Sequence, residues 1–261
     1  MNTAYLSARD PQGYLACPIT PITPSASSSA LCKMAASGAC SVADLCSNVR
    51  SNAQASFRIG SINRRTVRRG QALYRAGDTC VNFYQLYAGS LKLRMTNWAG
   101  EEQIASFPMP GALLGLDGIE TGKYLCDAIA LEDARVCVLS LSDLLACSRS
   151  GTEAMLQFNR VIARETSHYR RLLMVLANMS SEERIASFLL DLSERMASNG
   201  YSSREFILKM TREDIAHYLG MKIETVSRAF TRLQLANILD VRRRHLSIRD
   251  LDALKKLGMS H

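Results

Sequence analysis

The feature that most constrains this 261-residue chain is the stretch TREDIAHYLGMKIETVSRAFTRLQ at residues 211–234. Thr211 and Asp214 have the spacing of a helix-capping pair, and Gly220 tolerates the left-handed backbone of a tight turn. The first predicted helix directs three apolar residues inward, at Ile215, Ala216 and Leu219. The second begins near Lys222 and directs four inward, at Ile223, Val226, Phe230 and Leu233. Two helices around such a turn predict a helix-turn-helix, whose second helix enters the DNA major groove.

The other side of the second helix carries side chains that can hydrogen-bond to base edges. An Arg can bind guanine bidentately, a Glu can accept from the cytosine amino group, and a Ser can reach either edge. We therefore predict base contacts from Glu224, Ser227 and Arg228. Phosphate contacts are predicted around them, from Thr211, Lys222, Thr225, Arg232, Arg242, Arg243 and Arg244.

Positive charge is concentrated in the same part of the chain. Residues 203–256 hold 12 Lys and Arg against 7 Asp and Glu, which is most of the net charge of +8 on the whole sequence. A basic face attracts the phosphate backbone, so double-stranded DNA is the expected partner. The alternative is an ordinary helical pair with a solvated charged face.

The composition limits the class of protein. With 47% apolar and 21% charged residues, the chain can build folded cores. It has no run of 18 apolar residues, so neither a transmembrane helix nor a membrane partner is expected. The first 20 residues lack a basic segment followed by an apolar stretch, so we expect no secretory signal and a cytoplasmic protein.

Changes in pattern predict four segments in an α+β chain. Residues 1–50 are rich in Ser, Ala, Pro and Thr, which predicts a flexible arm that carries a cysteine cluster. Residues 51–149 alternate short apolar runs with glycines, which predicts an antiparallel β-roll of the jelly-roll type. Residues 150–179 predict a long dimerisation helix, and residues 180–261 a winged helix-turn-helix domain.

The last segment contains further local signals. Ser180 and Glu183 have the spacing of a capping box that opens a helix, and Gly200 closes this helix. A strand is expected at FILKM, residues 206–210. Two more strands, ILDV and HLSI, are expected on either side of an Arg-rich turn, which together form a wing.

The long predicted helix has an apolar stripe at intervals of three, four and seven residues. It is longer than one small domain needs, and such a helix usually packs against a partner helix. We predict a homodimer whose seam is formed by Met155, Phe158, Ile162, Tyr169, Leu172 and Leu176. The alternative is a buried connector within one chain.

Four segments of the sequence resemble a known family: GQALYRAGD (70–78), GEEQIASF (100–107), EERIASFLLDLS (182–193) and MTREDIAHYLG (210–220). Together with the order of β-roll, long helix and winged helix-turn-helix, they resemble the CRP/FNR family of bacterial transcription regulators, and within it the fumarate–nitrate reduction (FNR) branch. The resemblance runs from about Cys40 to the C-terminus. It implies a regulator rather than an enzyme, which binds DNA as a homodimer and contacts RNA polymerase through surface loops.

The second helix of the helix-turn-helix matches the E-x-x-S-R pattern of the FNR branch at Glu224, Ser227 and Arg228. That branch binds palindromes of TTGAT half-sites. The resemblance therefore implies that Arg228 reads the guanine side of the G:C pair and Glu224 its cytosine side. Ser227 then contacts the neighbouring thymine.

A β-roll of this type can also bind a cyclic nucleotide or hold a catalytic metal. The parent family often binds cyclic AMP through a Gly-Glu pair and an Arg that grips the phosphate. The matching stretch, GALLGLDGIETGKYLCDAIA (111–130), contains neither, so cyclic AMP is not expected.

A cupin-like metalloenzyme relies on imidazole ligands, and no His occurs between residues 51 and 147. The sequence therefore does not favour a cupin-like metalloenzyme.

The cysteines are then the candidate sensory residues, because reduced thiolates gathered together favour iron–sulfur clusters. In the FNR branch, three N-terminal cysteines and one from the β-roll hold an oxygen-labile [4Fe–4S] cluster. The motifs VADLC and ARVCVLS match the family around Cys46 and Cys137. The resemblance thus implies a [4Fe–4S] cluster held by Cys32, Cys40, Cys46 and Cys137, whose loss in oxygen weakens the dimer and its DNA binding.

The first ligand is where this chain departs from the family. A Cys usually stands two residues before the position of Cys40, where this chain has Gly38. Cys32 is the nearest earlier thiol, and Cys17 is the rival. Structural roles are expected for Cys80, Cys126 and Cys147, and Cys126, which is close to the sensory region, stays open as an alternative. The alternative function is a cluster-free regulator of the same family that senses nitric oxide or redox state.

Overall fold

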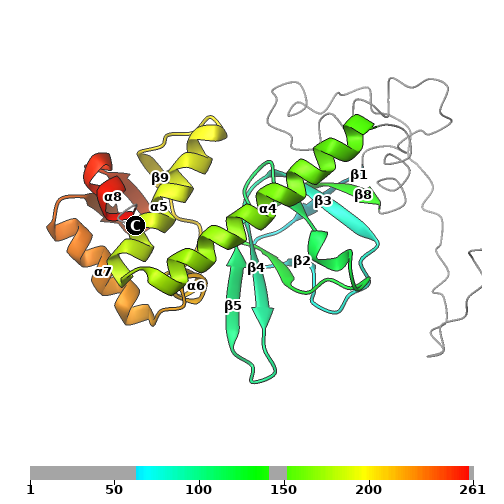
Figure 1. The fold of residues 1–261 in the computed structure, drawn as a ribbon, viewed down its shortest axis with the longest axis horizontal. Coiled ribbons are helices and arrows are strands. Elements are labelled where there is room, and N and C mark those ends of the chain that lie inside the picture. The colour runs from blue at the N-terminus through cyan, green and yellow to red at the C-terminus, as the bar shows by residue number, and fades with distance from the viewer. Residues whose placement is uncertain (1–62, 141–151, 259–261) are drawn as a thin grey trace, which may run out of the picture.

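The computed structural model describes residues 63–140 and 152–258. The first range forms two four-stranded sheets of antiparallel neighbours, in the orders β1-β8-β3-β6 and β2-β7-β4-β5. The strands are β1 (Asn63–Val67), β2 (Ala72–Tyr74), β3 (Asn82–Ala88), β4 (Leu91–Thr96), β5 (Glu102–Ser106), β6 (Leu113–Leu114), β7 (Asp127–Ala130) and β8 (Ala134–Ser140). The expected antiparallel β-roll, followed by a helix-turn-helix, is confirmed (Figure 1).

The inner faces of the two sheets build the core of the β-roll. In β4, Leu91 and Leu93 are buried and alternate with more exposed residues, as the period-two pattern predicts. The turn before β4 requires glycine, because Gly89 has a φ of +86° and a Cβ there would lie 2.7 Å from the Cα of Ala134. Phe83, at the centre of this core, is fully buried.

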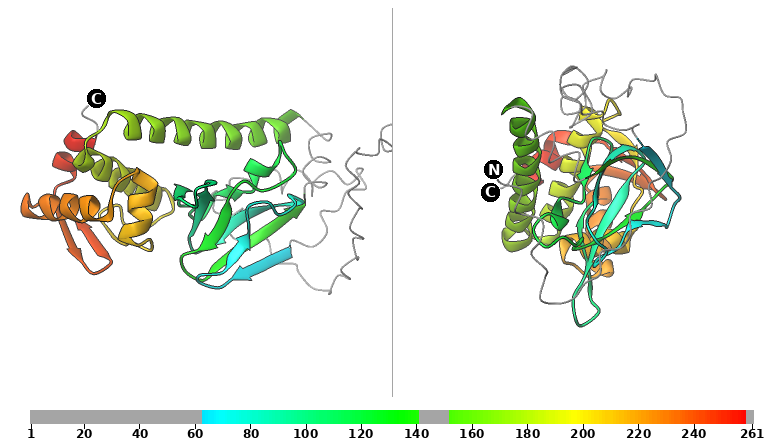
Figure 2. Two further views of the ribbon diagram at one scale, coloured as in Figure 1. Left: turned by 90° about the horizontal axis from the view of Figure 1, so that it is seen from below. Right: turned by 90° about the vertical axis from the view of Figure 1, so that its right-hand side faces the viewer.

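Helix α4 (Thr152–Asn178) runs along the β-roll and continues to the second half of the molecule (Figure 2). Val161, on its first half, is buried in the core of the β-roll. Leu172, on its second half, packs against the core of the winged helix. In the two ranges that the structure describes, no helix is long and apolar enough to cross a membrane.

The second half alternates helices with three short strands. The helices are α5 (Ser181–Ser198), α6 (Arg212–Leu219), α7 (Ile223–Leu235) and α8 (Leu251–Gly258). The strands, in the sheet order β10-β11-β9, are β9 (Glu205–Ile207), β10 (Leu239–Arg242) and β11 (His245–Ile248). The predicted capping box at the start of α5 is present, and the backbone N–H of Ser180 donates to Glu183 at 2.7 Å.

Two details of this half differ from the expectation. The strand predicted over residues 206–210 lies at Glu205–Ile207, because only these residues pair with β11. Helix α8 was not foreseen. It packs on α5 so closely that a Cβ at Gly258 would lie 2.7 Å from Leu190, a contact between segments far apart in sequence.

Candidate DNA-binding surface and cysteine site

Helix α6 is fixed at both ends by its own residues. Thr211 Oγ1 accepts from the backbone N–H of Asp214 at 3.0 Å, and the N–H of Thr211 donates to the Asp214 carboxylate at 2.8 Å. Gly220 ends the helix with a φ of 59°. Burial raises the pKa of Asp214, but hydrogen bonds from Lys92 and Thr211 outweigh burial and hold this pKa below its ordinary value. Asp214 is therefore a buried carboxylate that stays charged at neutral pH.

Helix α7 turns one side to the core and the other outward. Its buried side consists of Val226, Ala229, Phe230 and Leu233. Its exposed side includes Glu224, Ser227 and Arg228, the predicted base-contacting residues. The prediction that Ile223 faces the core is wrong, because its side chain is 43% exposed. The helix begins at this residue, so the side chain lies beyond the edge of the core.

The predicted phosphate-contacting residues lie around this exposed side in different settings. Lys222, Arg243 and Arg244 are exposed and form no ion pair within residues 63–140 and 152–258. Arg232 is paired with Glu182, and Arg242 lies 3.5 Å from Asp240. Thr225 is half-buried, and the hydroxyl of Thr211 is engaged in the cap of α6. The turn between β10 and β11 bends at Arg243, which has a φ of 59°.

Arg212 is a cation of this region that the sequence analysis missed. Its guanidinium lies over the ring of Phe230, 3.2 Å from the ring centroid. Burial lowers the pKa of Arg212 to about 10, so the side chain stays charged at neutral pH. This cation–π contact joins α6 to α7. Its sequence signal is weak, since the two residues are 18 positions apart and become neighbours only when the helices cross.

The predicted dimer residues of α4 fall into two groups. Ile162 and Tyr169 are each 37% exposed, and Leu173 on the same side of the helix is 65% exposed. Three others are partly buried: Phe158, Leu172 and Leu176. Phe158 packs against the core of the β-roll, and Leu172 packs against the core of the winged helix. The side chain of Met155 lies outside the described residues. Leu173 is the most exposed of these residues, whereas Ile162 and Tyr169 on the same stripe of α4 also line a cavity toward the β-roll.

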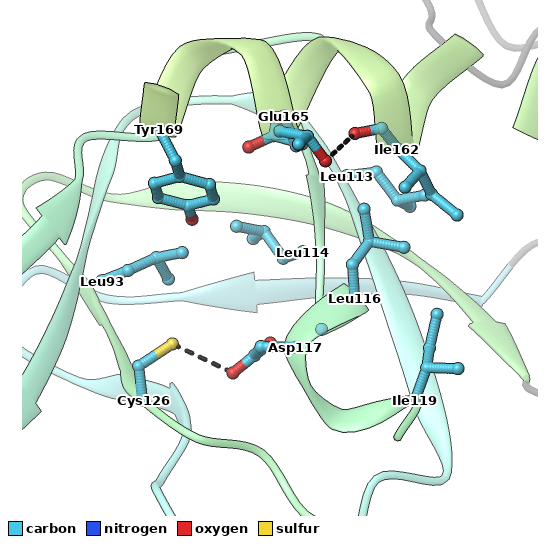
Figure 3. A pocket seen from close by; sticks show the side chains of 12 residues that line it. Leu93, Leu113, Leu114, Leu116, Asp117, Ile119, Cys126, Ile162, Glu165 and Tyr169 are labelled. Atoms are coloured by element: carbon cyan, nitrogen blue, oxygen red, sulfur yellow. Dashed lines mark hydrogen bonds between the residues drawn. The ribbon is translucent and has the colours of Figure 1, made fainter. Parts of the chain in front are cut away.

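A cavity of about 240 Å³ lies between the β-roll and α4 (Figure 3). Most of its lining is apolar and comes from leucine and isoleucine side chains of both elements. Asp117 and Cys126 face it from the β-roll, and Glu165 and Tyr169 from the helix. Burial raises the pKa of Glu165, and it raises that of Tyr169 to about 12. Among the residues that the structure describes, no Lys or Arg lines the cavity, so a phosphate group there would meet carboxylates and no described cation.

Cys80 and Cys126 are ordinary buried thiols of the β-roll core. Burial raises the pKa of both, and in Cys126 the charge of Asp117 adds to this effect. The Cys126 thiol donates to Asp117 at 3.2 Å. A thiol with a raised pKa stays protonated at neutral pH and is a poor metal ligand.

Cys137 has a different setting. It is buried on β8, at 7% exposed, but it is not part of the apolar cluster of the β-roll that includes its neighbour Val136. Successive strand residues point to opposite faces, so the Cys137 side chain lies on the outer face of the sheet. Arg64 on β1 is directly opposite Cys137 in the ladder, and residues so paired share a face. A cation therefore lies on the same face as this thiol.

The other predicted ligands, Cys32, Cys40 and Cys46, and the rival Cys17, lie outside the described residues. Strand β1 nevertheless fixes where the N-terminal segment joins the sheet, which is beside Cys137. Sixteen residues separate Cys46 from the start of β1, and an extended chain of this length spans up to roughly 50 Å. Within residues 63–140 and 152–258 no three His, Cys, Asp or Glu side chains gather as a metal site. A cluster at Cys137 therefore needs ligands from outside these two ranges, where Cys147 also lies.

Comparison with known proteins places the whole arrangement. Residues 64–150 match the cyclic nucleotide-binding domain, and residues 183–257 match the Crp-like helix-turn-helix domain. The transcriptional regulatory protein btr of Bordetella pertussis is 40% identical over 191 residues, which are 73% of this chain and 79% of that protein. The fumarate and nitrate reduction regulatory protein of Escherichia coli K12 is 34% identical over 221 residues, which are 84% of this chain and 88% of that protein.

A solved structure gives the same assignment. FixK2 from Bradyrhizobium japonicum superposes with a TM-score of 0.68 and 27% sequence identity, over 75% of this chain and 96% of that one. The fold, the helix-turn-helix and the relatives agree, and the chain therefore belongs to the CRP/FNR family of bacterial transcription regulators.

Proposed function

We propose that this protein binds palindromic DNA with TTGAT-type half-sites as a homodimer, and that an oxygen-labile [4Fe–4S] cluster controls this binding. The observation that carries the DNA half of the proposal is the exposed side of α7, where Glu224, Ser227 and Arg228 stand together on a helix whose other side is fixed in the core. Arg228 donates to guanine, Glu224 accepts from the paired cytosine, and Ser227 contacts the adjacent thymine.

Phosphate contacts hold the recognition helix in register. Lys222, Arg243 and Arg244 are the strongest candidates, because they are exposed and hold no ion pair with any residue of 63–140 or 152–258 that would have to break. Arg232 and Arg242 first exchange a carboxylate partner for a phosphate. The cap hydroxyl of Thr211 and the half-buried Thr225 complete the proposed set.

The dimer forms along α4 on the stripe of Ile162, Tyr169 and Leu173. Leu173 is the most exposed of the three, and a second copy covers it together with the parts of Ile162 and Tyr169 that the cavity leaves exposed. Met155, Phe158, Leu172 and Leu176 flank this stripe in the proposed seam. A symmetric pair of helices carries two recognition helices related by a two-fold axis, which is the symmetry of a palindromic site.

The cluster half of the proposal rests on Cys137, with Cys40, Cys46 and either Cys32 or Cys17 as the remaining ligands. The residues fit such a group: Cys137 is a thiol outside the apolar core, Arg64 places a cation on the same face, and β1 brings the N-terminal segment beside it. When bound, the cluster supplies a reaction with oxygen that dismantles it. The chain's own thiols tie the N-terminal segment to β8, and their release loosens the support of α4.

Other features support the same reading. Relatives that are named anaerobic regulatory proteins include one from Pasteurella multocida that is 36% identical over 84% of this chain. The β-roll cavity offers carboxylates and no cation, so we propose that cyclic AMP is not a ligand. The proposed protein is a cytoplasmic regulator without catalytic activity, which contacts RNA polymerase when bound to DNA.

DNA binding before and after exposure to air tests the proposal. Protein purified without oxygen is titrated against a TTGAT palindrome and against a scrambled duplex of equal length. The proposal expects tight anaerobic binding to the palindrome alone, and its loss in air together with the visible absorption of the cluster. Equal binding to both duplexes would contradict the DNA assignment. If binding to the palindrome is the same before and after exposure to air, a cluster-free regulator would be favoured instead.

A further inference from the structure

The β-roll sheet β2-β7-β4-β5 packs directly against the helix-turn-helix. Strand β5, at the edge of its sheet, lies beside α6 (Figure 1). Ile104 and Phe107 come from the β-roll in sequence, but they belong to the apolar core of the winged helix. The ring of Phe107 lies 5.2 Å from that of Tyr218 on α6, and 6.0 Å from that of Phe188 on α5. The core of the winged helix thus extends onto the β5 edge of the β-roll, while the rest of the β-roll has a core of its own.

Polar contacts cross the same boundary. The ammonium of Lys92 on β4 lies 2.5 Å from the carboxylate of Asp214 on α6. The amide of Gln103 on β5 donates to the backbone carbonyl of Tyr218 at 3.4 Å. Arg195 on α5 donates to the carbonyl of Phe107. The first two contacts connect the neighbouring strands β4 and β5 to α6, and the third connects the residue after β5 to α5.

The Lys92 contact differs from surface ion pairs, because it is largely removed from water. The Lys92 side chain is 20% exposed and that of Asp214 is 7% exposed. Asp214 also caps α6 through Thr211, so its carboxylate cannot move away without uncapping the helix. Removal of Lys92 leaves a buried charge without its cation, which the protein can relieve only if α6 moves toward water.

The other end of α6 is fixed by a different residue. Arg184 on α5 donates to the carbonyls of Leu176, Met179 and Leu219, each at 2.9 Å. One guanidinium therefore ties the last turn of α6 to the short connection between α4 and α5. Lys92 holds the N-terminal end of α6 to the β-roll, and Arg184 holds its C-terminal end to the dimer helix.

We infer that Lys92 is a positioning residue for DNA recognition, which fixes the direction of the helix-turn-helix relative to α4 and thereby sets the half-site spacing that the dimer accepts. The inference rests on the proposed binding to palindromic DNA. Two recognition helices must meet half-sites about one helical turn, roughly 34 Å, apart. When both ends of α6 are anchored, the dimer can bind half-sites at one spacing only. When the Lys92 end is free, the dimer can bind half-sites at several spacings.

The test compares spacing preference in four forms of the full-length protein, purified without oxygen: the wild type, Lys92→Met, Lys92→Arg and Lys123→Met. Lys123 is an exposed β-roll residue that forms no ion pair with any described residue, so its variant loses the same charge without touching the Lys92–Asp214 pair. Each form is titrated against palindromes whose half-sites are one base pair closer, normally spaced, or one base pair farther apart, and against a duplex with a single half-site.

Lys92→Met is expected to bind the normal palindrome about tenfold more weakly, a typical size for coupling between sites, and to lose most of its preference for normal spacing. Its binding to the single half-site should match that of the wild type. Lys92→Arg should restore the preference, and Lys123→Met should keep it. A thermal unfolding curve for each variant verifies that it is folded.

Unchanged spacing preference in folded Lys92→Met would overturn the inference, as would an equal loss of affinity on every duplex. Tighter binding would also overturn it, because the ion pair would then restrain the helix-turn-helix in an unsuitable direction. The wild-type titration tests the proposed function separately. If the wild type shows no preference for the palindrome, the proposed function is wrong and the inference about Lys92 falls with it, whatever the variants do.

Discussion

The winged helix and the β-roll carry their candidate functional residues in opposite ways. The base-contacting candidates lie within residues 224–228, on one side of a single helix. The cluster candidates are distributed, since Cys137 lies in the eighth strand and its partners precede the first. A local site follows from helix periodicity, whereas a distributed one depends on sheet register and on where the N-terminal segment joins it. We therefore expect single substitutions in the winged helix to lower DNA affinity partially. Single substitutions of the ligand cysteines are expected to remove the proposed [4Fe–4S] cluster altogether.

Cys137→Ser gives the largest expected effect. A hydroxyl is a poor ligand for iron, so the variant should lose the cluster, and with it the anaerobic DNA binding. Iron and sulfide analysis of anaerobically purified protein measures the loss. Cys126→Ser is the matched control, because its hydroxyl can keep the hydrogen bond to Asp117 and the residue lies in the core. A full iron content in Cys137→Ser would remove the β-roll from the ligand set.

The same analysis decides between the two candidates for the first ligand. Cys32→Ser is expected to lose the cluster, because Cys32 is the nearest thiol before Cys40. Cys17→Ser is its matched partner and should keep a full complement of iron. The reverse result assigns the ligand to Cys17.

Leu173→Asp should break the dimer. The residue is 65% exposed on the apolar stripe of α4, and a carboxylate there enters the apolar contact of the proposed seam. An unpaired charge in an apolar contact costs several kcal/mol, so palindrome affinity should fall by about a hundredfold or more. Sedimentation velocity measures the shift to monomer. Ser167→Asp adds the same charge on another side of α4 and should stay dimeric; a monomer from both would assign the effect to helix charge rather than to the seam.

Arg228→Ala should cost about 1–3 kcal/mol on a TTGAT palindrome and relax the preference at the G:C pair, because its guanidinium reads a base. Arg243→Ala, in the wing, should weaken specific and random DNA alike and reduce the salt dependence of binding. Fluorescence anisotropy over a range of salt separates the two. If both variants lose affinity equally on specific and random DNA, α7 is not the base-reading helix.

The smallest expected effect is a pH dependence of stability at His168. Burial lowers the pKa of His168 below its ordinary value of 6.5, with Arg195 and Arg171 acting in the same direction and Asp191 opposing. The folded protein then binds this proton less readily than the unfolded chain. Stability is complete above about pH 6.5 and declines as the pH falls through that value toward the folded pKa.

Thermal unfolding of the wild type and of His168→Gln between neutral and mildly acidic pH measures this contribution. Glu165, whose pKa burial raises, acts in the opposite sense, so the difference between the two proteins isolates His168. The variant should show the flatter profile at the acidic end. Parallel profiles would mean that His168 titrates normally in the folded protein.

The same contrast explains what the sequence could predict. The caps of α5 and α6 and the turn at Gly220 depend on residues a few positions apart, and the structure has them where local rules place them. Ile223 follows the apolar period of α7 but lies beyond the edge of the core, which periodicity cannot show. The Lys92–Asp214 pair joins residues 122 positions apart, so only the packing of the sheet on α6 brings it together.

The central claim, that one cluster governs DNA binding, is tested most directly by a titration with air-saturated buffer. Anaerobic protein bound to a labelled TTGAT palindrome is followed at once by visible absorption and by fluorescence anisotropy. The account predicts that both signals fall together, in proportion, and that Cys126→Ser behaves like the wild type. Loss of the absorption with DNA still bound, or DNA binding by a protein that never held iron, would contradict it.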